Sequence, residues 1–286
     1  MAKDLYDAGD LAKKSFQEAS DMMGLDLSKL CFEGPIEKLT ETDVTQPAVF
    51  VHSYIVNQLA KEKGLTADVV AGHSLGEFSA LVAAGVLSFS DALNIVVKRG
   101  RLMKECNEKT EGTMAAIMKF DIDQIRQACE EVDDVVQVAN YNSDAQIVIS
   151  GSVNGVHQAM ELIKSKGARI VKELQVGGAF HSPLMKPAED ELAKIINATE
   201  YKDASTDVYP NVTAKATRSG SELKSLSIKQ LTATVLWYDT LLNMHNDSVS
   251  QMVELGPGNV LSGIAKRLPF ELDVKAVGTL EEINQL

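Results

Sequence analysis

A short segment around residue 74 constrains the fold of this chain more than any other feature. Residues 72–78 read Gly-His-Ser-Leu-Gly-Glu-Phe, after an apolar run at 68–71 and before small residues at 79–84. A strand, a tight turn with Ser between two glycines, and a helix together form the G-x-S-x-G nucleophile elbow. The turn places the hydroxyl at a helix N-terminus, where backbone N–H groups stabilise developing negative charge. We therefore predict that Ser74 is an acyl-enzyme nucleophile rather than a mere capping residue.

Close packing of the strand on the helix is the second expectation from this motif. Gly72 and Gly76 lack side chains, so we expect both to let the two elements approach each other behind the Ser. The neighbouring His73 is expected to point away from the Ser hydroxyl.

A Ser hydroxyl needs a base, and the chain has five His residues. His181 lies in the loop Gly-Gly-Ala-Phe-His-Ser-Pro at 177–183, between a predicted strand and a predicted helix. Active sites of α/β proteins collect in such strand-end loops, so we predict that His181 is the base. His52 and His157 are expected on solvated or half-buried helix faces. No Asp is placed to orient the imidazole, so a dyad and a triad both remain open.

Arg99 follows the Ser in a long amphipathic helix predicted over 89–107. As an isolated residue it is interpreted as an ordinary surface Arg. Buried beside Ser74, however, its planar guanidinium would bind a carboxylate of the acyl group through two hydrogen bonds.

Composition excludes several function classes. The 286 residues suffice for one or two domains, and the net charge of −12 argues against nucleic-acid binding. The apolar stretches are too short to span a bilayer, and the charged N-terminus does not resemble a signal peptide. The three scattered Cys fit a reducing compartment and contain no zinc-binding pair. We expect a cytoplasmic enzyme that binds no metal and does not act at a membrane.

The order of predicted elements indicates an α/β protein with an inserted unit. Strand-helix-strand-strand-helix-strand over 113–174 is the ferredoxin-like order, predicted as a small subdomain at 111–177. The remaining residues, 1–110 and 178–286, are predicted to form the main α/β body. Its expected helices are 5–23, 46–62, 89–107, 185–197, 225–233 and 259–267, and its expected strands are 67–72, 207–212, 249–255 and 272–277. The stretch 214–224 is the most loop-like.

Several motifs together resemble one enzyme family. They are the elbow, Lys-Arg-Gly at 98–100, Ala-Phe-His-Ser at 179–182, Leu-Met-Lys-Pro at 184–187 and Glu-Leu-Gly-Pro-Gly at 254–258, supported by Thr-Gln-Pro-Ala at 45–48 and by Gln230-Leu231 with Trp237. In this order the chain is similar, over nearly its whole length, to bacterial malonyl-CoA:acyl carrier protein transacylases. The resemblance implies an α/β-hydrolase-like body with a parallel sheet, plus the ferredoxin-like insert. It also implies an S-malonyltransferase of fatty acid biosynthesis.

The resemblance implies roles for individual residues. Ser74 would carry the malonyl ester, and His181 would act as general base and then as general acid. The backbone carbonyl of Gln230 would orient the imidazole, and the N–H of Leu75 would donate to the oxyanion. Arg99 would bind the malonyl carboxylate, and Phe180 would leave little room for an α-methyl group. Further substrate-binding residues implied by the family are Met103, Gln46 and Asn142.

The family's partners follow from the same resemblance. Malonyl-CoA is a substrate, so no cofactor is expected, and the second substrate is the pantetheine thiol of acyl carrier protein. Because carrier proteins are acidic, as is this chain, docking would need a local cationic rim. Candidates for that rim flank the motif loops: Lys186, Lys229, Lys266 and Arg267. We expect a monomer.

One family feature has no counterpart in the sequence. The family begins with a buried strand and a Gly-Gln-Gly-type loop that donates a second oxyanion N–H, whereas this chain starts at Met1-Ala2-Lys3. Loss of one oxyanion donor costs about 10²–10³ in rate elsewhere. A start codon assigned too late is the favoured explanation, ahead of a shortened chain or a weakly active relative.

Alternative functions stay open at this point. A trans-acting acyltransferase of polyketide assembly would use the same residues. A thioester-cleaving serine hydrolase would leave Arg99 without a role. A non-catalytic relative that only binds the carrier protein would fit the missing oxyanion donor but not the intact Ser74 and His181.

Overall fold

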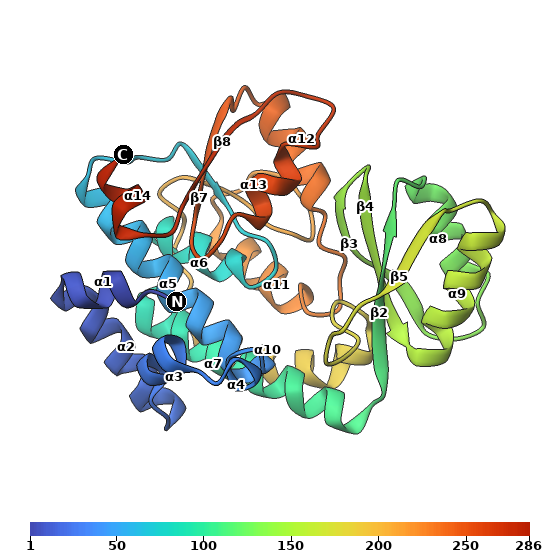
Figure 1. Cartoon of the computed structure of the whole chain (residues 1–286), viewed down its shortest axis with the longest axis horizontal. Coiled ribbons are helices and arrows are strands. Elements are labelled where there is room, and N and C mark those ends of the chain that lie inside the picture. Colours follow the sequence, from blue (N-terminus) through green and yellow to red (C-terminus); the bar gives the residue numbers. More distant parts are fainter.

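The computed structural model describes all residues from 1 to 286 and has a mixed α/β architecture. Figure 1 shows a larger, mainly helical part that holds both termini, beside a smaller unit built on β2–β5. No helix of the chain combines the length and apolar character needed to cross a membrane.

The helices of the larger part surround a buried core of Leu, Ile, Val, Phe and Ala side chains. The long helices α5 and α7 pack against each other at its centre (Figure 1). The helical bounds are α1 Lys3–Ala8, α2 Asp10–Met23, α3 Leu27–Glu33, α4 Ile36–Leu39, α5 Thr42–Glu62, α6 Gly76–Ala83, α7 Phe89–Lys109, α10 Lys186–Ala198, α11 Gly220–Lys229, α12 Trp237–Asn246, α13 Val260–Ala265 and α14 Leu280–Asn284. A short 3₁₀ turn, η1, covers Pro183–Met185.

The contact between α5 and α7 depends on Gly100. A Cβ atom at this position would lie 2.9 Å from the carbonyl oxygen of Thr42, so only glycine lets α7 pass this close to the start of α5. Ser88 caps α7 by accepting a hydrogen bond from the Asp91 N–H. This packing brings the first turns of α5 beside residues 99–103 of α7, where the site is built.

The strands of the larger part pair in parallel, but they do not form one sheet. β1 (Val69–Ala71) pairs with β6 (Asp207–Tyr209), and β7 (Gln251–Leu255) pairs with β8 (Asp273–Val277). The predicted single parallel sheet is thus replaced by two two-stranded ladders with no hydrogen bonds between them. Parallel pairing still brings the carboxyl ends of β1 and β6 to one edge.

The smaller unit is a four-stranded antiparallel sheet in the order β3-β4-β2-β5. Its strands are β2 Gly112–Met118, β3 Val136–Ser143, β4 Gln146–Ser152 and β5 Ile170–Glu173, with α8 Ile122–Glu130 and α9 Val153–Ser165 between them. Alternating side chains, among them Ile117, Val138 and Ile149, pack with α8 and α9 on the outer face. The opposite face presents Met114, Ala116, Ala139 and Val148, against which Phe180 packs.

Several sequence predictions about helices were wrong in their bounds. The helix expected at 5–23 is interrupted at Gly9, whose extended backbone ends α1 and starts α2. α5 begins at Thr42, ahead of the predicted 46, and encloses Pro47. α11 begins at Gly220 within the stretch expected to be loop, because Ser219 caps it through the Glu222 N–H.

Candidate active site

The elbow places Ser74 in a strained turn between β1 and α6. Ser74 has a φ of 51°, in the left-handed region that non-glycine residues rarely adopt. A Cβ at position 72 would lie 1.9 Å from the Gly76 backbone, so the strand and helix touch here. At Gly76 itself a Cβ would meet nothing within 4 Å, so the expectation that both glycines serve close packing was wrong for Gly76.

Asn211 holds this turn in place. Its Oδ1 accepts a hydrogen bond from the Ser74 N–H at 2.7 Å, and its Nδ2 donates to the Gly72 carbonyl at 2.7 Å. The side chain is fully buried and lies just after β6, the strand paired with β1. Sequence reasoning missed Asn211, although its position at the end of a parallel strand was an available signal.

His181 contacts the Ser74 hydroxyl although it lies 107 residues later in the chain. Its Nε2 lies 2.8 Å from the Ser74 Oγ, and its Nδ1 lies 2.9 Å from the carbonyl oxygen of Gln230. Because a carbonyl can only accept, Nδ1 carries the hydrogen and Nε2 is left to accept the hydroxyl proton. Burial, reinforced by the Arg99 charge, lowers the pKa of His181 to about 3. The ring is therefore neutral at ordinary pH.

Arg99 lies on the other side of the hydroxyl. Its Nη2 donates to the Ser74 Oγ at 3.0 Å and to the Gln230 Oε1 at 3.2 Å, and its Nη1 donates to the Gln46 Oε1 at 2.6 Å. Only 2% of the residue is exposed. Burial lowers its pKa to about 10, which leaves the guanidinium charged at neutral pH.

All hydrogen-bond acceptors of this guanidinium are neutral oxygens, and no carboxylate is within ion-pair distance. A buried cation without a direct carboxylate partner is costly unless a ligand supplies one. Arg99 thus places an unpaired positive charge beside a hydroxyl that is bonded to an imidazole, where it could hold an anionic group.

Comparison with known proteins agrees with this geometry. The sequence profile of the acyl transferase domain family matches residues 1–276. The chain belongs to this acyl transferase family. A malonyl CoA-acyl carrier protein transacylase of Bacillus subtilis (strain 168) is 43% identical over 287 residues, covering 99% of this chain and 90% of that protein. The Haemophilus influenzae protein of the same name is 38% identical over 288 residues, covering 99% and 92%.

Solved structures show the same fold at full coverage. An acyl carrier protein S-malonyltransferase from Vibrio cholerae matches with a TM-score of 0.95 and 37% identity, covering all of this chain and 94% of that one. A malonyl-transacylase solved in complex with a type II polyketide acyl-carrier protein matches with a TM-score of 0.94 and 37% identity, covering 100% and 93%.

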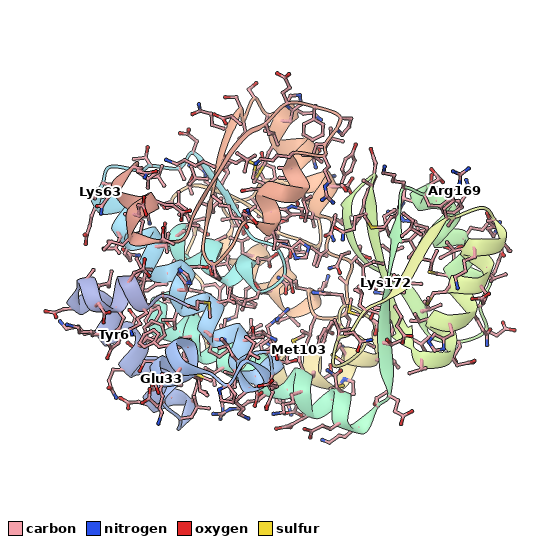
Figure 2. All side chains as sticks on the ribbon, viewed as in Figure 1. Tyr6, Glu33, Lys63, Met103, Arg169 and Lys172 are labelled. Atoms are coloured by element: carbon pink, nitrogen blue, oxygen red, sulfur yellow. The ribbon has the colours of Figure 1, made fainter.

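The other predicted residues of this acyl transferase surround the Ser74–His181–Arg99 cluster. Gln46 is buried and bridges Arg99 to Met103, whose Sδ lies 3.3 Å from the Gln46 Nε2. Met103 is thus placed behind Gln46, near the middle of the view in Figure 2. The N–H of Leu75 takes no part in the hydrogen bonds that close the turn, which come from the N–H groups of residues 76–78.

Asn142 and Phe180 form no hydrogen bond with Ser74, His181 or Arg99. The Asn142 Oδ1 lies 2.8 Å from the Nε2 of His73, and that ring packs edge-on against Trp237, so His73 does point away from Ser74. Phe180 is half-buried between the main core and the inner face of the small sheet. The structure therefore places Asn142 beside the elbow rather than in contact with the hydroxyl.

Glu77 is a second buried ionisable group that sequence reasoning did not single out. Its Oε2 accepts a hydrogen bond from the Asn211 N–H at 2.6 Å. Burial raises the pKa of Glu77 to about 7, although the Asn211 N–H, the Gln230 amide and the Arg99 charge oppose the rise. Asn211 therefore links the carboxyl group of Glu77 to the backbone N–H of Ser74 in the elbow.

The other His residues lie outside the cluster. His52 is buried, so the expectation of a solvated or half-buried helix face was wrong. Its Nε2 lies 2.7 Å from the Gly278 carbonyl oxygen, which satisfies this buried nitrogen. His157 lies exposed on α9 beside Glu173. His245 lies in the last turn of α12 rather than in a loop.

Proposed function

We propose that this chain transfers malonyl groups from coenzyme A to the pantetheine thiol of an acyl carrier protein. The observation that carries the proposal is the buried Arg99 guanidinium, which has no carboxylate partner and lies 3.0 Å from the Ser74 hydroxyl. A malonyl thioester has its carboxylate one methylene away from the reacting carbonyl, so both groups fit this pair. The names of the relatives support the same substrates.

The first half-reaction uses the hydroxyl and the imidazole. Ser74 Oγ attacks the thioester carbonyl while His181 Nε2 takes its proton. The carbon–sulfur bond then breaks, and CoA leaves as a thiol with the proton from His181. The N–H of Leu75, which is unused by the turn, would donate to the oxyanion.

The second half-reaction reverses these steps with another thiol. The pantetheine sulfur attacks the Ser74 ester, and its proton passes to His181 Nε2. The ester carbon–oxygen bond breaks, and the proton returns to the Ser74 oxygen. Arg99 keeps the malonyl carboxylate bound through both steps, which holds the carbonyl toward the incoming thiol.

The finer architecture belongs to this proposal as well. We assign residues 1–110 and 178–286 to an α/β-hydrolase-like body and residues 111–177 to a ferredoxin-like subdomain. The strand–helix order from β2 to β5, with the sheet order β3-β4-β2-β5 and both helices on one face, supports the second assignment. The elbow between β1 and α6 supports the first.

Pathway and setting complete the proposal. The solved complex with a polyketide carrier protein favours a second candidate, transfer to polyketide carriers by the same residues. Three free, buried cysteines support a reducing compartment, and we assign the protein to the cytoplasm. We further propose that it acts as a monomer and without a cofactor, because CoA enters as a substrate.

A two-step mass measurement tests the function. Incubation with malonyl-CoA should add one malonyl group, and peptide mapping should place it on Ser74. Addition of holo carrier protein should then remove the ester and yield malonylated carrier, with fatty-acid and polyketide carriers compared side by side. Ser74→Ala is the control and should stay unmodified. Release of free malonate in place of malonyl-carrier would contradict transfer and indicate a hydrolase.

A further inference from the structure

One side chain of the small sheet reaches the backbone that carries the base. Gln137 lies in β3, the edge strand on the side of the sheet facing α12 (Figure 1). Its Nε2 donates to the carbonyl oxygen of His181 at 2.8 Å and to that of Thr232 at 2.8 Å. An amide nitrogen has two hydrogens, so this group satisfies two carbonyls at once.

The two carbonyls belong to two different segments, one that carries the imidazole of His181 and one that orients it. His181 has a φ of 55°, and a non-glycine residue holds this conformation only where its surroundings stabilise it. Thr232 lies two residues after Gln230, whose carbonyl accepts the Nδ1–H of His181. Gln137 therefore joins the loop that carries the imidazole to the loop that orients it.

Neighbouring hydrogen bonds join β3 only to the second of these loops. Thr234 Oγ1 donates to the Val138 carbonyl at 2.6 Å, and the Val235 N–H donates to the Ala139 carbonyl at 2.8 Å. These contacts fix residues 234 and 235 along β3 but do not reach residue 181. Gln137 is the side chain of β3 that extends the attachment to the His181 backbone.

We propose that Gln137 is a positioning residue for the Ser74–His181 pair. By holding the His181 and Thr232 carbonyls together, it keeps Nδ1 on the Gln230 carbonyl and Nε2 on the Ser74 hydroxyl. The small sheet then acts on the reaction through the backbone of the base, without touching the substrate. This inference rests on the proposed function for the role of His181 as the base.

The variant Gln137→Met tests the proposal, because it keeps the length of the side chain and removes both donors. Thr234→Val is the matched control, since it removes a hydrogen bond between the same strand and loop without affecting residue 181. The main measurement is the labelling rate of Ser74 by a fluorophosphonate, in which the Ser oxygen displaces fluoride from phosphorus. This readout depends on activation of Ser74 and not on malonyl-CoA.

We expect Gln137→Met to lower the labelling rate and kcat by about 10- to 100-fold, because small displacements of a base cost this much. KM for malonyl-CoA should change far less, since Gln46 still holds Arg99. Thr234→Val should keep both rates within about two-fold of the wild type, as expected for a site without a catalytic contact. Gln137→Lys, which restores donors, should recover part of the loss.

Two results would overturn the proposal. One is a Gln137→Met protein that labels as fast as the wild type. The other is an equal loss in Gln137→Met and Thr234→Val that follows their thermal midpoints, which would make the contact merely structural. A wild-type protein that labels at Ser74 but accepts no malonyl group would refute the proposed function, while the labelling comparison would still decide the role of Gln137.

Discussion

The Nδ1 atom of His181 lies 2.9 Å from the main-chain carbonyl oxygen of Gln230, in the place that a carboxylate occupies in a Ser-His-Asp triad. The alternatives of dyad and triad are thereby resolved in favour of a dyad oriented by a peptide group. A carbonyl fixes the ring and its tautomer, but it stabilises an imidazolium less than a carboxylate does. Burial and the nearby Arg99 charge accordingly hold the pKa of His181 far below its usual range, at about 3.

The low pKa predicts an unusual pH dependence. Only the neutral imidazole can take the Ser74 proton, and a pKa of about 3 keeps it neutral from alkaline pH down to mildly acidic pH. The rate of Ser74 acylation should therefore stay nearly constant between about pH 8 and pH 5, whereas a His of ordinary pKa would lose activity below about 6.5. Stopped-flow measurement of the Ser74 acylation rate over this pH range tests the prediction, and circular dichroism confirms that the protein stays folded. If the acylation rate fell tenfold per pH unit below about pH 6.5, the low pKa of His181 would be contradicted.

The buried guanidinium of Arg99 leads us to expect a preference for malonyl-CoA over acetyl-CoA. Arg99→Ala removes the cation that pairs with the malonyl carboxylate, so kcat/KM for malonyl-CoA should fall by on the order of 100-fold. The rate with acetyl-CoA, which has no carboxylate, should change little by comparison. The ratio of the two kcat/KM values is the measurement, and Lys98→Ala on the same helix is the control. An unchanged ratio would remove Arg99 from substrate recognition.

The two glycines of the elbow should respond oppositely to the same substitution. Gly72→Ala forces a Cβ to 1.9 Å from the Gly76 backbone, so we expect a loss of more than about 3 kcal/mol in unfolding free energy or no folded protein. Gly76→Ala has room for its Cβ and lies in the first turn of α6, so it should be neutral or stabilise by about 0.5–1 kcal/mol. Denaturant unfolding of both variants measures this contrast. Equal losses would show that the turn is not packed as described.

Local signals predicted most of the fold. The elbow and the strands of the small sheet depend on neighbouring residues, and each lies where the pattern placed it. The predicted helix bounds were wrong where contacts with distant residues matter. α5 starts at Thr42, where its first turn packs against Gly100 of α7. The division of the parallel strands into two ladders has no local signature either.

The site divides in the same way. Ser74, His181 and Arg99 belong to residue types whose chemistry identifies them, and the structure brings their side chains together. Asn211 and Gln137 act on backbone groups of other segments, so the sequence around Gln137 does not point to the site, and Asn211 is indicated only by its position at the end of a predicted strand. The burial of Glu77 was hidden because an acidic residue in the first turn of a helix is ordinarily solvated.

The charged surface predicts how a carrier protein docks. Lys186 is paired with Glu189 at 2.6 Å and with Asp190 at 2.8 Å, so it contributes little free positive charge, whereas Lys229 is exposed in the last turn of α11. Lys266 and Arg267 are exposed at the end of α13 and form no ion pair. Their reversal to Glu should raise KM for the carrier protein several-fold at low salt, roughly the effect of removing steering charges.

The two half-reactions separate this docking effect from a general defect. Acylation by malonyl-CoA should stay near the wild-type rate in the double variant, and Lys63→Glu, at the C-cap of α5 (Figure 2), is a charge-reversal control on another element. If both half-reactions slow equally, these two residues do not form a carrier-binding surface. A KM that falls toward the wild-type value with added salt would not occur for a folding defect.

Gln230 makes three attachments at once: its carbonyl receives His181, its Oε1 receives Arg99, and its Nε2 donates to the Ser74 carbonyl at 3.0 Å. Because one residue contacts the base, the guanidinium and the backbone of the nucleophile, we expect the site to discriminate between dicarboxylic acyl groups by their length. A succinyl thioester is one methylene longer than a malonyl thioester, so it should fit the fixed separation of Arg99 and Ser74 less well. Selection against longer diacids would then follow from the same residue that orients the proton acceptor.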